Sequence, residues 1–283
     1  RGERPERERE LRRRITEHLY QRAAAGESGL LADLAELVDN EVLRWAIPGE
    51  GPSGLRVDDV APGDLDDVPM LVTHRGVGDW LAATKALVEE APRCAVVAKD
   101  TEGRLCGLCI AVAAGDAPAA AERDPILGGW VTHARANAPD GNALIWRDSL
   151  DLTPLHGTTD SRVLPLLNTV AIKRSGLSNP RWSYLPIDPG NQVAVEFARN
   201  VGARHVPELD VAYDEKVQEC HILDHGPGGM FAAYRAAVYE ELQLEPPPVG
   251  ADADADASRE VTADTVKEAL RTLDRPLELS RSP

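Results

Sequence analysis

Apolar residues near the start of the chain recur at the spacing of a helix. Leucine and isoleucine lie four residues apart within 6–24, with arginine and glutamate between them, so they would share one helical face. Gly26 ends this pattern, and Ser28 is a candidate cap for a second helix that continues to Val38. Residues 1–50 are therefore expected to form a helical hairpin that closes on a Gly/Pro-rich linker.

From residue 51 onward, short apolar runs alternate with helical patterns. The apolar runs that predict strands lie at 55–60, 94–99, 105–114, 142–152, 182–187, 205–211 and 219–223. The stretches with one apolar helical face lie at 64–73, 78–90, 128–138, 161–175, 191–201 and 234–242. Because a strand, a loop, a helix and a strand follow one another between 142 and 187, we expect 142–152 and 182–187 to pair in parallel.

The end of the chain has a different composition. Residues 245–258 contain three consecutive prolines and an Ala-Asp repeat, which predicts an extended or disordered linker. Within 259–283, Val266, Leu270 and Leu273 lie on one side of a short amphipathic helix, which we expect to lead to a domain outside this chain. The residues between the hairpin and the linker, 51–244, form the predicted central domain.

Composition narrows the functional classes. The 283 residues include 43% apolar residues, enough for a sizeable core, and carry a formal net charge of −16. A surface of that sign repels phosphate backbones and anionic lipids, so we expect no direct nucleic-acid partner and no membrane partner. No apolar run approaches the ~20 residues that span a bilayer, and no signal peptide is visible, which predicts a cytoplasmic location.

The cysteines and histidines show no spacing typical of a metal site. Cys106 and Cys109 form a CxxC inside an apolar run, and on a strand they would point to opposite faces, as buried reduced thiols. His221 and His225 straddle a predicted strand end, which makes a zinc site there weak. We therefore expect no metal site. The sequence also contains no nucleotide-binding motif and no serine-hydrolase motif.

The stretch from Trp182 to Asp210 carries a family resemblance. It contains a strand, then Asn191, a helix and Gly202, leading into a further strand, although Ala203 stands where phenylalanine is usual. In this order of elements the chain resembles the GNAT family of N-acyltransferases. The resemblance implies an α/β (α+β) fold, with a mixed, twisted sheet flanked by helices, and acetyl-CoA or another acyl-CoA as the possible cofactor.

The resemblance also implies where an acyl-CoA would bind. The family's cofactor loop precedes a helix N-terminus, whose backbone N–H groups approach a pyrophosphate. The corresponding positions here, together with the Asn of the later turn, are Gly157, Thr158, Thr159, Ser161, Arg162 and Asn191. This loop has one glycine, and Asp160 places a negative charge where pyrophosphate would lie, which indicates a degenerate loop. Alternatively, Asp160 or Ser161 is an ordinary helix N-cap.

The family's usual catalytic groups are altered. Counting back from Gly202 places Ala198 where the family often has a tyrosine acid. Tyr184 is then the candidate acid and Asp148 the candidate base, with core packing and a paired carboxylate as the alternatives. Asp151 lies at odd spacing from Asp148 and would face the other side of the strand.

Three functions remain open from the sequence. The missing tyrosine and the single-glycine loop favour a degenerate acyltransferase domain with a sensing or scaffold role. The order of hairpin, GNAT-like domain, linker and Val-x-x-Ala-Leu-Arg-x-Leu helix is also similar to a region of large multidomain bacterial regulators. The first alternative is an active acyl-CoA-dependent N-acyltransferase. The second is a structural connector between an ATPase and a DNA-binding module. The expected partners are a small-molecule or acyl-CoA ligand and the flanking domains of a longer chain.

Overall fold

The computed structural model describes residues 3–27, 30–39, 54–61, 63–71, 77–155, 161–175, 177, 179–213 and 216–248. The helices are α1 (Glu3–Ala24), α2 (Leu30–Glu36), α4 (Asp64–Leu71), α5 (Val77–Glu90), α6 (Ala119–Arg123), α7 (Leu127–Asn137), α8 (Val163–Arg174), α9 (Gln192–Asn200) and α10 (Gly229–Glu241). The strands are β1 (Arg56–Asp59), β2 (Ala95–Lys99), β3 (Leu105–Ala113), β4 (Ala143–Asp151), β5 (Trp182–Ile187), β6 (Arg204–His205), β7 (Val211–Tyr213) and β8 (Lys216–Asp224).

The strands form one mixed sheet. Their order is β1-β2-β3-β4-β5-β8-β6, and β7 pairs with β8 outside this path. β4 and β5 pair in parallel, whereas the other neighbours are antiparallel. The predicted parallel pairing of 142–152 with 182–187 is therefore confirmed, and the chain has the mixed, helix-flanked α/β fold that the sequence implied.

The parallel pair is short. β4 and β5 are in register only from Ala143↔Trp182 to Ile145↔Tyr184. Beyond that point β4 stays paired with β3 as far as Asp151, and β5 stays paired with β8 as far as Ile187. The two strands thus belong to separate halves of the sheet beyond their first three residues.

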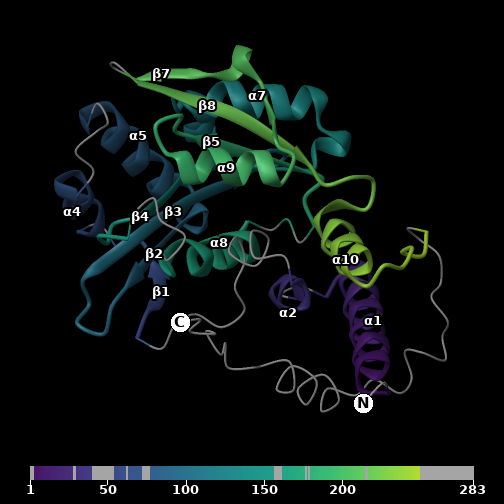
Figure 1. The fold of residues 1–283 in the computed structure, drawn as a ribbon. Helices are drawn as coiled ribbons and strands as arrows, with labels where there is room; N and C mark the ends of the chain where they lie inside the picture. Colours follow the sequence, from purple (N-terminus) through teal and green to yellow (C-terminus); the bar gives the residue numbers. More distant parts are fainter. Residues whose placement is uncertain are drawn as a thin grey trace.

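Helices pack on both faces of the sheet and enclose two cores. The hairpin core joins α1, α2, α8 and α10 to one face, with Leu34, Leu167 and Val238 among its fully buried members. The α5–α7 core joins α4, α5, α6 and α7 to the other face, with Leu87 and Trp130 among its members. Figure 1 shows α1, α2 and α10 gathered beside α8 and away from α4 and α5. The predicted hairpin helices therefore share a core with the central domain.

A glycine lets α8 lie close against the sheet. A Cβ atom built on Gly107 of β3 would stand 2.4 Å from Cγ1 of Val163 and 2.7 Å from the carbonyl oxygen of Leu150. A Cβ atom does not approach another heavy atom this closely, so a side chain at this position would clash with α8 and with the backbone of β4.

Two sequence-based predictions are wrong in detail. The expected strand at 205–211 is interrupted by a 3₁₀ turn at Pro207–Leu209, between β6 and β7. Proline lacks the N–H that a strand ladder needs, so the pairing stops there. Cys106 and Cys109 do not face opposite sides, since both pack in the hairpin core. Gly107 pairs with Ala98 and Leu105 with Lys99, which leaves Cys106 as a β-bulge that shifts the alternation.

All four cysteines are free thiols. Within the described ranges, no helix combines the length and apolar character needed to cross a membrane. The expected helix within 259–283 and most of the expected linker at 245–258 lie outside the described residues. The domain boundaries at residues 50, 244 and 258 stay predictions.

Candidate functional site

The centre of β4 carries two consecutive charged residues on one face of the sheet. Ile110 of β3 pairs with Asp148, whereas the next residue of β3, Ala111, pairs with Trp146. Arg147 is therefore the extra residue of a β-bulge. The bulge removes one step of the alternation between faces, so the side chains of Arg147 and Asp148 both reach α5.

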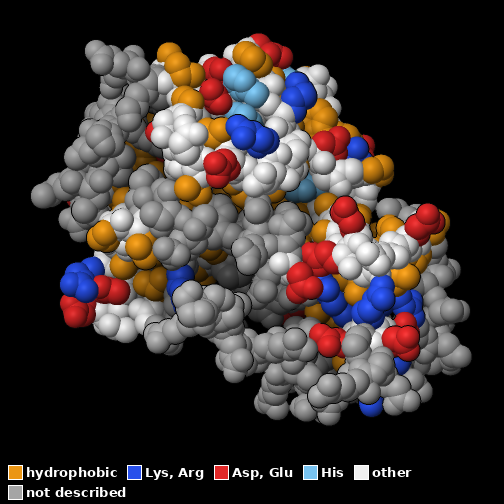
Figure 2. Space-filling view, viewed as in Figure 1, with side chains coloured by type: hydrophobic (Ala, Val, Ile, Leu, Met, Phe, Trp, Pro, Cys, Tyr) orange, Lys and Arg blue, Asp and Glu red, His pale blue; other side chains and the backbone are white. Residues whose placement is uncertain are grey.

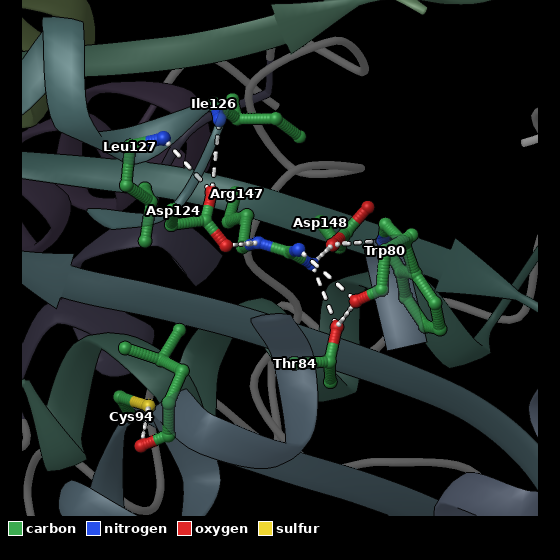
Figure 3. Close-up of polar contacts among 9 residues, drawn as sticks. Trp80, Thr84, Cys94, Asp124, Ile126, Leu127, Arg147 and Asp148 are labelled. Carbon is green, nitrogen blue, oxygen red and sulfur yellow. Dashed lines mark hydrogen bonds and ion pairs between the residues drawn. The ribbon is translucent and has the colours of Figure 1, made fainter. Parts of the chain in front are cut away.

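Arg147 is fully buried and bound by several groups (Figure 3). Its Nε donates to Oδ2 of Asp124 at 2.7 Å, and its Nη1 donates to Thr84 at 2.9 Å and to Oδ2 of Asp148. The guanidinium carbon also lies 5.4 Å from the centre of the Trp80 ring. A buried guanidinium needs such partners because it cannot lose its proton. We call Trp80, Thr84, Asp124, Arg147 and Asp148 the arginine cluster.

Asp124 links the arginine cluster to the start of α7. Its Oδ1 accepts hydrogen bonds from the backbone N–H groups of Ile126 and Leu127, at 2.9 and 3.0 Å. These donors have no partner within a helix at its first turn, so the carboxylate satisfies them while it neutralises Arg147. The cluster thereby fixes α5, α7 and β4 to one another (Figure 3).

Asp148, the candidate base, is enclosed by the same cluster. Only 1% of the residue is exposed, and its Oδ2 accepts from Nε1 of Trp80 at 3.0 Å as well as from Arg147. To accept a proton from a bound amine, this carboxylate would need to reach the amine and give up its ion pair. Asp151 lies two residues before Thr153 and accepts its backbone N–H at 2.8 Å.

Tyr184, the candidate acid, lies on the same face of the sheet but against another helix. Its side chain is fully buried, and its hydroxyl lies 2.7 Å from Nδ1 of His133 in α7. The rings of Trp130 and Trp182 stand 6.5 Å from the tyrosine ring. Burial raises the pKa of Tyr184 above its ordinary value, because the phenolate would be poorly solvated there. The hydroxyl is therefore protonated at neutral pH and held by its neighbours.

Three of the predicted cofactor residues, Ser161, Arg162 and Asn191, lie at the starts of two helices. Gly157, Thr158 and Thr159 lie outside the described residues. Ser161 and Arg162 precede α8, where Ser161 is 2% exposed and Arg162 is exposed.

Asn191 is the N-cap of α9. Its side-chain oxygen accepts the backbone N–H of Ala194 at 3.2 Å. This contact accounts for the asparagine as a helix cap, and a role in cofactor binding stays a prediction.

The end of α9 carries Ala198, the position that the sequence resemblance compared with a tyrosine. Ala198 is fully buried, and its carbonyl accepts the N–H of Ala203 at 2.8 Å. Gly202 has φ +74°, as a left-handed helix end requires. The turn that follows α9 in the family's pattern is thus formed here without a hydroxyl at position 198.

Sequence reasoning found Asp148 but missed the partners that define its environment. Trp80, Thr84 and Asp124 come from α5 and from the turn before α7, far from Arg147 in the chain. A charged pair inside an apolar strand, Arg147-Asp148, was the available signal, since such residues are rarely buried unless they are paired.

The comparisons with known proteins found weak similarity to solved structures. No protein-family model and no curated protein matches the chain. Among solved structures, mutant forms of the spermidine/spermine N-acetyltransferase SpeG from Vibrio cholerae are 14% identical, over 61% of this chain and 93% of that one, with a TM-score of 0.37. SpeG in complex with manganese ions is 14% identical over 60% and 91%, with a TM-score of 0.36. The strand order and the short parallel pair of β4 and β5 define the fold.

Proposed function

We propose that this chain is a GNAT-like domain that does not catalyse acyl transfer and serves as a sensing or scaffold module. The observation that carries this proposal is the position of Asp148. Asp148, the carboxylate predicted to act as the base, is buried in an ion pair with Arg147 and accepts a hydrogen bond from Trp80. A general base must come within hydrogen-bond reach of the proton that it removes.

The candidate acids support the same proposal. Position 198 is alanine, which cannot donate a proton to a leaving thiolate. Tyr184 has a hydroxyl, but it is buried against His133 on the face that α5–α7 cover. A role for Tyr184 in packing and hydrogen bonding is sufficient to account for its contacts.

An active N-acyltransferase is the alternative, and one observation favours it. β4 and β5 pair over only three residues before they follow different neighbours. Strands that part in this way can admit an extended ligand between them, and an acyl-CoA arm is such a ligand. A domain that has lost catalysis can keep such a ligand, and this is the basis for proposing a sensing role.

The shared hairpin core supports the scaffold part of the proposal. Helices α1 and α2 are packed against α8 and α10, and Arg12 of α1 pairs with Glu241 of α10. The hairpin before the central domain and the last helix of that domain are thus joined through one core, which suits a module that connects flanking domains. A place within a multidomain bacterial regulator, between an ATPase and a DNA-binding module, stays a proposal from sequence.

An acyl-transfer assay tests the proposal. The full chain is incubated with acetyl-CoA and a panel of primary amines that includes polyamines and peptide N-termini, and free CoA and acylated products are followed by mass spectrometry. We expect no product above the protein-free control. Turnover that Tyr184→Phe or Asp148→Asn abolishes, in variants that keep the wild-type circular dichroism, would establish the active alternative.

A further inference from the structure

Two histidines on neighbouring strands face each other. His205 of β6 is the direct cross-strand partner of His221 of β8. Their rings are stacked, with centres 4.9 Å apart and planes 15° from parallel. Glu219 lies two residues before His221 on β8 and therefore points to the same face. The backbone register thus brings two imidazoles and one carboxylate together.

These three side chains have the spacing of a metal site. Each offers one ligand atom, and the three atoms lie within 4.8 Å of one another. Donors that each stand ~2.1 Å from one ion are at most about 4.2 Å apart, so small side-chain rotations suffice to close the site. We propose that His205, Glu219 and His221 bind a divalent transition-metal ion of the zinc class.

The surroundings of the histidines support this proposal. Nδ1 of His221 is buried and has no hydrogen-bond partner among the described residues, whereas Nε2 lies 2.9 Å from Glu219. Both carboxylate oxygens of Asp210 lie 3.0 Å from Nε2 of His205, and Asp210 itself accepts the N–H of Cys220. A carboxylate beside a ligating imidazole fixes its orientation and tautomer, which is the usual outer arrangement of a metal-bound histidine.

Charge and access also suit a cation. Glu219 and Asp210 place two carboxylates beside the two imidazoles, and a divalent ion would balance them. The side chains of His205 and Glu219 are 36% and 25% exposed, so an ion can reach them from solvent. Figure 2 shows histidine side chains at the surface with acidic side chains beside them, where β7 and β8 lie.

The donor set selects the type of ion. Two imidazoles and one carboxylate suit zinc, cobalt, nickel or ferrous iron better than calcium or magnesium, which prefer oxygen donors only. Three protein ligands leave at least one coordination position for water. His221 and Glu219 pair across the sheet with Leu185 and Ile187 of β5. The site therefore lies beyond Tyr184, the last residue of β5 that pairs with β4.

Metal titration of the tag-free, metal-stripped chain tests the proposal. Calorimetry with Zn²⁺ and absorption spectroscopy with Co²⁺ are run on the wild type, on Glu219→Gln, on the His205→Ala/His221→Ala double variant and on the control His18→Gln, which alters a histidine in α1. We expect about one ion per chain in the wild type and the control. Affinity should fall at least tenfold in Glu219→Gln, and the visible Co²⁺ bands should vanish in the double variant.

Two results would overturn this site. One is the absence of stoichiometric binding in the wild type. The other is binding that stays the same in Glu219→Gln and in the double variant, which would place the ion elsewhere. Thermal unfolding with and without Zn²⁺ guards against loss of fold, because an ion that binds the native state raises its midpoint. Zn²⁺ should raise the midpoint of the wild type and of His18→Gln, raise that of Glu219→Gln less, and leave that of the double variant nearly unchanged.

Discussion

Arg147 joins two buried carboxylates in the arginine cluster, so its removal takes away the guanidinium that both of them bind. Breaking a buried ion pair by deleting one partner destabilises proteins by about 3–5 kcal/mol. We expect Arg147→Met to lower the free energy of unfolding by about this amount, measured by urea denaturation.

Lys85→Met is the matched control for this prediction. Lys85 pairs with Asp66 at 2.7 Å, but both side chains are largely exposed. Exposed pairs contribute about 0–1 kcal/mol, so this change should have little effect. Equal effects of the two substitutions would mean that the arginine cluster does not hold β4, α5 and the turn before α7 together.

His225 gives a prediction for acid conditions. Burial lowers the pKa of His225 from 6.5 to about 4, and its Nε2 lies 2.9 Å from the Ser183 hydroxyl. Because the unfolded chain takes up this proton near pH 6.5, the contribution of a neutral His225 to stability is fully present above that pH. It is lost as the pH falls from about 6.5 towards 4, by at most about 3 kcal/mol at 1.36 kcal/mol per pKa unit.

The measurement is the unfolding free energy of the wild type minus that of His225→Gln, at several pH values. The subtraction removes the contribution of the carboxylates common to both chains. The difference should become smaller, or change sign, between pH 7 and pH 4. A difference that does not vary with pH would show that His225 titrates normally in the native state.

At the scale of elements, the contact between α8 and β3 depends on Gly107. Gly107→Ala places a methyl group against Val163 and the carbonyl of Leu150, and overpacking of this kind costs typically about 1–3 kcal/mol. Gly129→Ala in α7 is the control, because nothing lies within 4 Å of its added Cβ and alanine favours a helix by up to ~1 kcal/mol. Thermal unfolding should show opposite shifts, and a stabilising Gly107→Ala would contradict the close approach of α8.

The elements themselves were largely predictable from periodicity, whereas their local irregularities were not. The apolar face of α9 and the glycine at its end, which has a left-handed conformation, predicted the helix that ends near Gly202. A run of residues that favour strands predicted the strand at 182–187. The bulges at Cys106 and Arg147 arise where one strand carries a residue more than its partner. Register depends on the partner strand, so neither bulge is visible in a single sequence.

For the candidate sites too, the sequence predicted the residue types but not their surroundings. Asp148 and Tyr184 were identified by residue type, but their enclosure by Arg147, Trp80 and His133 depends on helices packed from elsewhere in the chain. The pairing of His205 with His221 was missed altogether, because the two residues meet only through the register of two antiparallel strands.

At the scale of the whole molecule, a buried ion pair joins the N-terminal hairpin to α10. Arg235 donates two hydrogen bonds to Glu17, at 2.6 and 2.8 Å, and both side chains are almost fully buried. We expect Glu17→Gln to destabilise the chain by several kcal/mol and to speed amide hydrogen exchange in β4 as well as in α1, since the hairpin core includes both.

Glu10→Gln is the control for that experiment, because Glu10 forms an exposed pair with Arg13 on the same helix. It should change stability by less than about 1 kcal/mol. If Glu17→Gln speeds exchange in α1 and α2 alone, the hairpin unfolds independently of the sheet.

The proposal that this chain carries a degenerate acyl-CoA loop is tested most directly by calorimetric titration of the full wild-type chain with acetyl-CoA. The loop before α8 has one glycine and an aspartate at position 160, and an unfavourable charge near a helix N-terminus weakens anion binding by ~0.3–1 kcal/mol. Weak binding or none is expected, with Asp160→Gly binding severalfold more tightly if this loop is an altered cofactor site. A submicromolar dissociation constant for the wild type would contradict the proposal.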